Sequence, residues 1–472
     1  MRDLFFVVCF VVALVSGCAS HTDQLVRPSN PTISELEPAL SQNASEIKAS
    51  WWAALGDIQL NTLIERALAH SPSLETAGAR IAAAQSIANS QQSTLLPQFG
   101  FSAQADKQQL SQNYFFAPGM DTYNGYGLIE TTLNWSLDIW GKQRKYFDAS
   151  LRRIQAAKLN AAAAQLLLTS TVVRVYIDYD RATHLRSINS QELTIRNKLY
   201  HIATARQKVG LGEALEVNQR LADKDLAQAR LTQSETAVVV FQHQLAALVA
   251  QGPSFGEALK PPQIEWGNHD LPKLIPANLL ARRPDLQVLL TQIDASELDL
   301  AASKLEYLPD VNLQGYVGAQ SFGLPLLFQS ASQTFSVGPV LSLPIFDGGR
   351  ISANILGKES ARNERISVYQ DQLLTALKEA ADGIANVKST DSELEQNKQA
   401  QIRADNNLRI QEERKRVGLT TTDNVLNAKL VSVQQLRNVL DSRARLFSAE
   451  VSLIQALGGS YQISQEKSFQ TQ

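Results

Sequence analysis

The sequence predicts a mixed α/β membrane protein with an internal duplication, in which each copy carries membrane strands and long paired helices. Three observations predict this fold class. Short motifs recur in the same order in both halves of the chain, four segments alternate apolar with polar residues, and heptads of apolar residues continue through two long stretches. The composition is that of a folded protein, with 44% hydrophobic and 19% charged residues. The net charge of -2 gives no reason to expect a nucleic-acid partner.

The N-terminus has the pattern of a secretory signal. Arg2 precedes an apolar run, 4–15, that is too short to cross a bilayer. The run ends in Val15-Ser16-Gly17-Cys18, which resembles the bacterial lipobox, where the chain is cut before a lipidated cysteine. We expect a lipoprotein signal peptide at 1–17 and lipidation of Cys18. An ordinary signal peptide with a chance cysteine is the alternative.

The same region predicts in which membrane the mature chain resides. Ala19 stands where the resembling sorting pattern has aspartate for inner-membrane retention, so the outer membrane is favoured. No apolar run after Cys18 approaches the length of a transmembrane helix, and any membrane spanning therefore has to be done by strands. We expect residues 18–57 to form a lipidated N-terminal linker.

An internal repeat organises the rest of the chain. Pro72 and Pro97 have the same spacing as Pro284 and Pro309, and the motifs around them match. The segment Trp135–Trp140 resembles Leu341–Phe346, with Arg144 answering Arg350, and Val209-Gly210-Leu211 recurs as Val417-Gly418-Leu419 after a slightly smaller offset. We expect a first repeat at 58–270, a second at 271–459 and a polar tail at 460–472.

Both repeats follow one plan. The pattern predicts a first helix at about 58–92 and again at 278–305, two strands, a long helix, a break that contains glycine, and another long helix. The long helices are expected from about Gly141 to Lys208 and from Gly349 to Arg416. At 1.5 Å per residue each is about 100 Å long.

Four segments have the period of two that marks a half-buried strand. The pattern fits a tilted membrane strand and a soluble sandwich strand equally well. The apolar residues of the four segments are Phe99, Phe101, Ala103 and Ala105; Leu133, Trp135, Leu137 and Ile139; Val311, Leu313, Gly315, Val317 and Ala319; and Phe335, Val337, Leu341, Leu343 and Ile345.

Of these two interpretations of the strands, the heptads in the second pair of long helices favour the membrane strand. Sustained heptads predict long coiled-coil helices, which we expect beside the strands. They run through Ile366, Leu373, Ala380, Val387, Leu394, Gln401 and Leu408, and then through Leu426, Val433, Leu440, Phe447 and Ile454. Four membrane strands cannot stand alone, because an open sheet leaves backbone groups unpaired in hydrocarbon. Chains must share a barrel, of eight strands from two chains or twelve from three.

The chain resembles the TolC-type outer-membrane factors, in the lipoprotein branch that contains OprM and NodT-like channels. The resemblance covers about 51–459 and rests on Trp52, Gly56–Leu60, Leu63-Ile64, Leu95–Pro97, Trp135–Arg144, Arg282–Leu286, Leu343–Arg350 and Ala456–Gly459. It implies a TolC-like homotrimer with a shared 12-stranded β-barrel, four strands per chain, and a long α-helical periplasmic barrel. It also implies an outer-membrane exit duct of a tripartite efflux system for small molecules or drugs. The partners would be a periplasmic adaptor and an inner-membrane pump of the resistance-nodulation-division type, with no cofactor and no catalysis.

The sequence departs from that family at the periplasmic end of the helical barrel, where the family's channel closes. Asp423 occupies a commonly apolar gate position, Asn427 replaces an aspartate, and Glu216 takes the matching acidic position after the first turn. Asp423 and Asn427 are spaced i, i+4 and share a helix face. We predict that these three residues line the periplasmic aperture, where symmetry makes each charge a ring. Solvated residues on the outer face are the alternative. The two Val-Gly-Leu turns are expected to contact the adaptor.

Two rival functions remain open at this point: the outer-membrane duct of a type I protein secretion system, and a structural coiled-coil lipoprotein without a pore. An enzyme is not indicated. Gly252–Gly256 fits the G-x-S-x-G pattern of serine hydrolases, but a helix rather than a strand is expected before Ser254. The six histidines show no pair with metal-ligand spacing.

Overall fold

The computed structural model describes residues 50–109, 111, 123–265 and 282–459, and all that follows refers to them. The lipobox, most of the linker and the polar tail lie outside the described residues. The chain forms two compact units. The sheet unit contains Arg80–Lys158 and Val288–Tyr369, and the helical unit contains the described parts of Pro31–Ala79, Leu159–Gln287 and Gln370–Gln472.

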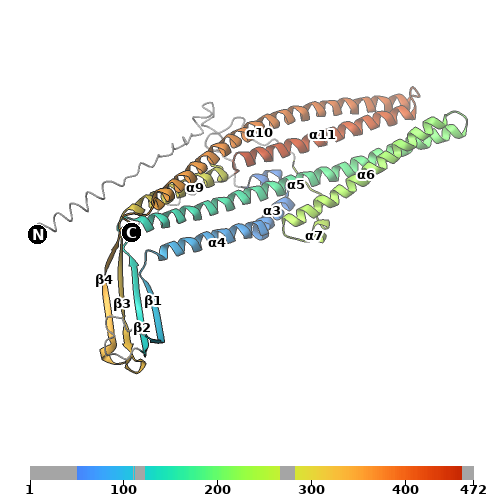
Figure 1. Ribbon diagram of the computed structural model, residues 1–472. Helices are drawn as coiled ribbons and strands as arrows, with labels where there is room; N and C mark the ends of the chain where they lie inside the picture. Colours follow the sequence, from blue (N-terminus) through green and yellow to red (C-terminus); the bar gives the residue numbers. More distant parts are fainter. Residues whose placement is uncertain (1–49, 110, 112–122, 266–281, 460–472) are drawn as a thin grey trace. The chain divides into compact units, whose positions relative to one another are not determined.

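Helices dominate the chain, and the strands come in two pairs (Figure 1). The helices are η1 (Trp51–Leu55), α3 (Ile58–His70), α4 (Pro72–Ser93), α5 (Lys142–Lys208), α6 (Ala214–Leu248), α7 (Pro253–Glu257), α9 (Pro284–Lys304), η2 (Leu305–Tyr307), η3 (Leu324–Leu326), η4 (Ser330–Ser332), α10 (Arg350–Arg416) and α11 (Thr422–Ala456). The strands are β1 (Gln98–Gln109), β2 (Tyr123–Ser136), β3 (Asp310–Phe322) and β4 (Gln333–Ser342).

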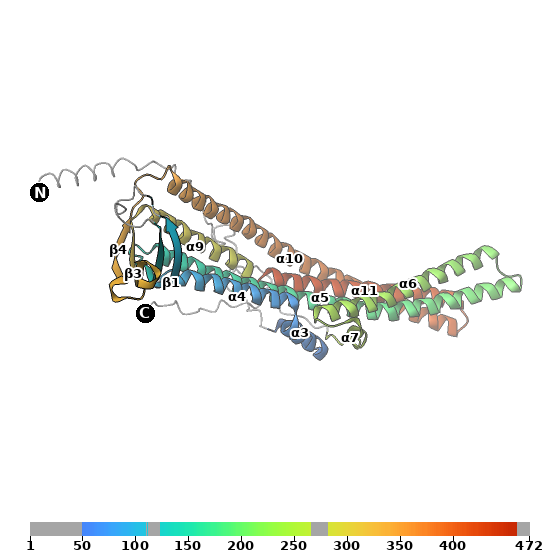
Figure 2. The ribbon, with the colours of Figure 1, turned by 60° about the horizontal axis from the view of Figure 1, so that its bottom comes forward.

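The four strands form one antiparallel sheet in the order β1-β2-β3-β4. The outer two pairings are those within each repeat, and the central pairing of β2 with β3 joins the two repeats. Each long helix turns back through a short loop into a shorter helix, so that α5 with α6 and α10 with α11 form two hairpins (Figures 1 and 2).

The internal duplication is confirmed by the lengths of these elements. α5 and α10 have 67 residues each. α6 and α11 have 35 residues each. The start of α10 follows the start of α5 by the same number of residues as the start of α11 follows the start of α6. The sequence offset between β1 and β3 is slightly larger.

The sheet register corrects one detail of the predicted repeat. Gln98 pairs with Asn134 as Asp310 pairs with Ser342, so Asn134 of β2 corresponds to Ser342 of β4. The shift from β2 to β4 is therefore the same as the shift between the equivalent helices. The predicted match of Trp135 to Leu341 is wrong, because Trp135 corresponds to Leu343 in this register.

The predicted first helix is two helices, broken at Ser71. Ser71 has an extended backbone (φ -68°, ψ 125°), because a residue before proline is disfavoured in the α region. Pro72 then opens α4, where its missing N–H does no harm. In the second repeat α9 begins at Pro284, and the predicted start at 278 lies outside the described residues. A proline opens the helix that leads to the strands in both copies.

The strands before the long helices end earlier than predicted. β2 stops at Ser136, and Asp138 takes a left-handed conformation (φ 43°) while its carboxylate accepts the N–H groups of Gln143 and Arg144 at the start of α5. In the second repeat β4 ends at Ser342, and Asp347 accepts from Ile351 in the same way. Residues 137–139 and 343–345 are therefore linkers to capped helices.

The predicted heptads form the interior of the helical unit. Leu373 and Ala380 of α10, and Leu453 and Ile454 of α11, are buried. Gly383 has a packing role that the sequence did not reveal, since an added Cβ would come within 3.1 Å of the Leu453 side chain. Glycine here allows α10 and α11 to approach closely.

Asp57 and Arg283 each form a buried polar clamp in the helical unit, meaning a set of hydrogen bonds from one side chain to several segments. Asp57 caps α3 by accepting from the N–H of Gln59, and its other oxygen accepts from the Tyr176 hydroxyl at 2.6 Å and from the N–H of Gln263. Arg283 donates to Asp285, to Glu379 and to the carbonyl oxygen of Ala456 near the end of α11. Each clamp joins segments that are far apart in sequence.

Candidate channel site

The sheet has one apolar and one polar face, as the alternation predicted. Odd-numbered residues of all four strands share a face, because each pairing joins odd to odd. Large side chains on it are exposed: Phe99 by 74%, Val337 by 67% and Phe335 by 82%. Leaving a phenylalanine uncovered forgoes roughly 1.5–3 kcal/mol of burial. A contiguous apolar face of this kind indicates a surface that meets something other than water.

The opposite face of the sheet is polar. It carries Ser102, Gln104, Glu130, Asn312, Gln314 and Ser336. Among the described residues β1 pairs only with β2, and β4 only with β3, so both outer strands have an unpaired edge. A sheet that is apolar on one side, polar on the other and open at both edges can form part of a larger wall around a polar interior.

The tips of the two helical hairpins have the same structure. Gly210 and Gly418 both adopt φ 78°, a left-handed conformation that glycine adopts without penalty. At the first tip the N–H of Leu211 donates to the carbonyl of Arg206, and at the second Leu419 donates to Arg414 in the same way. These bonds close the helix ends as Schellman motifs.

The residues on either side of the tip glycines are apolar but exposed. The exposed fractions are 69% for Val209, 79% for Leu211, 58% for Val417 and 68% for Leu419. Each tip therefore presents exposed aliphatic side chains on a turn that is closed by a glycine.

Asp423 is held by an ion pair at the base of the second tip. Its Oδ2 lies 2.7 Å from Nη1 of Arg206, so the first turn of α11 is bonded to the last turn of α5. The Asp423 side chain is 16% exposed, and its Oδ1 is buried without a hydrogen-bond partner among the described residues. The pair therefore joins the two hairpins close to their tips.

The other two predicted aperture residues make weaker contacts. Asn427 lies one turn after Asp423 on α11, is exposed, and lines a hollow of about 310 Å³ with Asn407 and Asn424. Glu216 lies on α6, where one oxygen is 3.9 Å from a guanidinium nitrogen of Arg220. The structure thus places Asp423 and Asn427 on the same helix, with Asp423 directed toward Arg206, and Glu216 on a separate helix.

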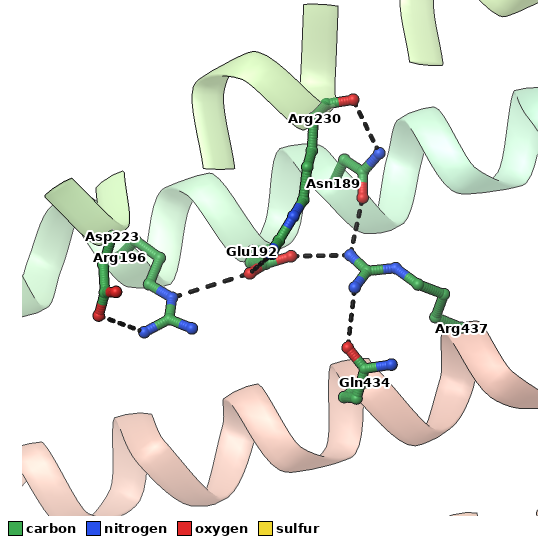
Figure 3. Close-up of polar contacts among 7 residues, drawn as sticks. All are labelled: Asn189, Glu192, Arg196, Asp223, Arg230, Gln434 and Arg437. Atoms are coloured by element: carbon green, nitrogen blue, oxygen red, sulfur yellow. Dashed lines mark hydrogen bonds and ion pairs between the residues drawn. The ribbon is translucent and has the colours of Figure 1, made fainter. Parts of the chain in front are cut away.

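An ion cluster with a buried centre, farther from the hairpin tips, was missed by the sequence analysis (Figure 3). Its centre is Glu192 of α5, whose side chain is 7% exposed. One oxygen accepts from Arg230 of α6 at 2.9 Å and the other from Arg437 of α11 at 2.7 Å. Arg196, whose Nε is 3.8 Å from Glu192, continues the cluster to Asp223. One carboxylate therefore connects three helices and both hairpins.

A further ion pair follows the same contact between α5 and α11. Arg181 donates to Asp441 at 2.7 Å, so bridges occur near residues 181, 192 and 206 of α5. Between them the two helices pack through an apolar cluster: Ile188, Ile195, Leu199, Leu426, Val433 and Leu440. The only sequence signal for these bridges is that charged residues flank the heptad positions, which does not identify their partners.

One carboxyl group of α11 is strongly perturbed. Burial, together with the negative charge of Asp391 on α10, raises the pKa of Glu450 to about 7. No sequence signal distinguishes Glu450 from the other charged residues of α11.

Ser254 of the G-x-S-x-G pattern lies in the short helix α7, which follows helix α6. The strand that a nucleophile elbow requires before its serine is not there within this described segment.

Within the described residues, no helix is both long enough and apolar enough to cross a membrane.

The family model for outer membrane efflux proteins matches residues 63–251 and 275–459. The chain belongs to the outer membrane efflux protein family. The two matched segments correspond to the two structural repeats, and together they cover most of the chain.

Two curated relatives of this outer membrane efflux protein are resistance proteins. The fusaric acid resistance protein FusA of Burkholderia cepacia is 30% identical over 364 residues, 75% of this chain and 68% of FusA. The multidrug resistance outer membrane protein MdtP of Escherichia coli K12 is 28% identical over 476 residues, covering 95% of this chain and 94% of MdtP.

Solved structures have the same fold. The outer membrane protein VceC of Vibrio cholerae is 30% identical and superimposes with a TM-score of 0.80 over 88% of this chain and 100% of VceC. The CmeC outer membrane channel of Campylobacter jejuni is 22% identical, with a TM-score of 0.83 over 94% of this chain and 96% of CmeC.

These findings confirm the resemblance and the fold class. The protein has the TolC-like fold, whose chains form trimers with a shared barrel, and each chain contributes a four-stranded antiparallel sheet. It is an outer-membrane efflux channel protein that extends into the periplasm, the exit duct of a tripartite efflux system. Because the family consists of channels, the chain is not an enzyme.

Proposed function

We propose that three copies of this chain form a homotrimeric duct that exports small molecules, including drugs, across the outer membrane. The observation that carries the proposal is the sheet, with its exposed apolar face, its polar opposite face and its two unpaired edges. Three such sheets make a closed wall of twelve strands with no edge left in hydrocarbon. The apolar face then meets lipid, and the polar face lines the passage.

The hairpin tips support a periplasmic partner for the duct. Each tip presents exposed Val and Leu side chains on a glycine turn, which suits the end of another helical hairpin. The proposed partner is a periplasmic adaptor that links the duct to an inner-membrane pump of the resistance-nodulation-division type. Leu211→Glu combined with Leu419→Glu should leave bilayer conductance unchanged and abolish dye efflux from cells. Unchanged efflux would remove the tips from the docking surface.

The aperture remains as proposed from the sequence, with Asp423, Asn427 and Glu216 around the periplasmic opening. The ion pair with Arg206 gives Asp423 a second role, because it holds the two hairpins together near the opening. Asp423→Ala should raise single-channel conductance and lower the preference for cations. Glu412→Ala, an exposed change on α10, serves as the control. If conductance and selectivity stay as in the parent channel, Asp423 is not part of the gate.

Cys18 is proposed to carry the lipid that anchors the mature chain to the outer membrane. Cells labelled with an alkynyl palmitate should show a labelled protein that Cys18→Ser abolishes and Cys9→Ser leaves intact. Labelling that survives Cys18→Ser would refute the anchor.

The function as a whole is tested by two measurements. Deleting the gene should increase dye accumulation in cells, and the purified protein should conduct ions in a planar bilayer. Conductance without any effect on dyes or drugs would favour a protein secretion duct. No conductance, with a monomer in detergent, would favour a structural coiled-coil lipoprotein.

A further inference from the structure

The loop between β3 and β4 folds back onto the sheet. It comprises residues 323–332, which form the apolar strap, and it contains the short helices η3 and η4. It lies at the end of the sheet opposite to the starts of α5 and α10 (Figure 1). The N–H of Gly323 donates to the carbonyl of Gly125 on β2 at 2.6 Å, which turns the chain toward β2. Gly323 adopts a φ of 100°, in the left-handed region that favours glycine.

Two leucines of the apolar strap lie over two glycines of β2. A Cβ atom added to Gly127 would come within 3.0 Å of Leu327 and 3.1 Å of Leu324. A Cβ atom added to Gly125 would come within 3.3 Å of Leu324. Leu327 is only 6% exposed. The two glycines therefore provide the space in which the strap is seated.

The apolar strap covers part of the apolar face of the sheet. Gly125, Gly127 and Ser321 are odd-numbered residues, and odd-numbered residues form that face. Ser321 is buried, and its hydroxyl donates to the carbonyl of Gly323 in the strap. Lys107 pairs with Gly125 and belongs to the same face, at the same end of the sheet. The strap is thus seated on the face that the proposed function places against lipid.

The backbone of the apolar strap bonds to itself. The N–H groups of Leu326 and Gln329 donate to the carbonyls of Gly323 and Leu326, each at 3.0 Å. The Ser332 hydroxyl also donates to the Leu326 carbonyl, at 2.8 Å. Backbone polar groups beside hydrocarbon have to be paired within the protein, because no water is there to bond them. The strap meets this requirement in its helical turns.

The outer surface of the apolar strap consists of large apolar side chains. Phe328 is 84% exposed, and Leu324 and Leu326 are 44% and 46% exposed. Between Asp310 and Asp347 the chain contains no Asp, Glu, Lys, Arg or His. The strap therefore has neither a charge of its own nor one on the chain that adjoins it, which is unlike a loop built to stand in water.

Lipid is the occupant that these observations favour. Exposed apolar patches mark contacts with membranes or proteins, and this patch continues the apolar face of the sheet. We propose that the apolar strap, held on β2 by Leu324 and Leu327, lies at the boundary between headgroups and acyl chains of the outer leaflet. There Leu326 and Phe328 contact acyl chains, and Lys107 lies at the level of the headgroups. The inference rests on the proposed function and adds the loop to the lipid contact of the sheet.

Spin labels on single added cysteines test where the apolar strap lies. Phe328→Cys and Leu326→Cys place a nitroxide on the strap of the full-length channel, which is then reconstituted in phospholipid vesicles. Val337→Cys is the reference on the apolar face and Ser336→Cys the reference on the polar face. The parent protein controls for labelling of its native cysteines. Molecular oxygen is apolar and concentrates among acyl chains, whereas a nickel chelate stays in water.

The ratio of oxygen to nickel-chelate accessibility at the Phe328 and Leu326 positions should be at least about three-fold higher than at Ser336, and close to that at Val337. A high ratio at Val337 with low ratios on the strap would overturn the strap's contact with lipid and leave the proposed function in place. Labels on the strap that are shielded from both probes would show a protein partner there and would also overturn it. A low ratio at Val337 would refute the proposed function itself.

A glycine substitution tests the seat of the apolar strap. Gly127→Val would fill the space that Leu327 and Leu324 occupy, so the label at Phe328 should become more mobile in its spectrum. Gly338→Val is the matched control, because a Cβ atom added to Gly338 meets nothing within 4 Å. Equal mobility of the label in the two variants would overturn the role of the two leucines in holding the strap.

Discussion

The sheet unit and the helical unit use the same kinds of apolar side chain in opposite ways. In the sheet, Phe335 and Leu341 lie on the apolar face and are largely exposed, whereas Leu373 and Phe447 of the helices are buried. The helical unit also buries a charged group, because the carboxylate of Glu192 lies among arginines. The difference shows that the apolar side chains of the helical unit are covered by packing within the chain, whereas those of the sheet are left for the proposed contact with lipid.

Removing the central charge of the buried cluster is the most severe test of the helical unit. Glu192→Gln leaves Arg230 and Arg437 without their carboxylate, which should cost about 3–5 kcal/mol of stability. The exposed Glu412→Gln on α10 should cost almost nothing. Thermal unfolding of the helical circular-dichroism signal in detergent measures both. Equal melting temperatures for the two variants would show that the cluster does not stabilise the hairpins.

Truncating leucine separates the two units directly. Leu373→Ala opens a cavity in a fully buried position and should destabilise the protein by about 2–5 kcal/mol. Leu341→Ala makes the same change on the exposed apolar face and should cost about 1 kcal/mol or less. The comparison uses the same melting experiment. If Leu341→Ala destabilised the protein as much as Leu373→Ala, the contrast between the two units would be wrong.

Adding charge to the sheet tests its two faces. Val337→Arg puts a guanidinium on the face proposed to meet lipid, which should cost about 2–4 kcal/mol and reduce the amount of assembled protein in the outer membrane. Ser336→Arg changes the adjacent residue on the polar face and should assemble normally with altered ion selectivity. Heat-labile oligomer on gels of outer-membrane fractions is the readout. Normal assembly of Val337→Arg would contradict lipid contact on that face.

The titration of Glu450 gives an effect that is seen only when the pH is changed. Its pKa is raised to about 7 in the folded protein, so the folded state holds the proton more tightly than the unfolded chain does. The corresponding stability is complete below about pH 4.5 and is lost as the pH rises to about 7, by an amount of about 3 kcal/mol. Glu450→Gln should flatten this part of the melting curve against pH. An unchanged pH profile would show that Glu450 does not titrate there.

Many local features could be predicted from the sequence because they depend on local periods. Alternation predicted the strands, heptads predicted α10 and α11, and the Val-Gly-Leu motifs predicted both hairpin turns. The errors also have local causes. The helix break at Ser71 and the start of α9 at Pro284 follow from proline, and the early end of β2 follows from the capping role of Asp138.

The sequence by itself determined the duplication, the face of each strand and the buried side of α10 and α11. Recurring motifs revealed the duplication, and the spacing of apolar residues along the chain encodes the other two. Only the tertiary structure decided that Arg206 meets Asp423 and that Glu192 gathers arginines from two other helices. It also decided that Asn134, rather than Ser136, is the β2 residue equivalent to Ser342 of β4. These contacts depend on the relative register of segments that are far apart in the sequence. Spacing along one helix or strand carries no information about that register.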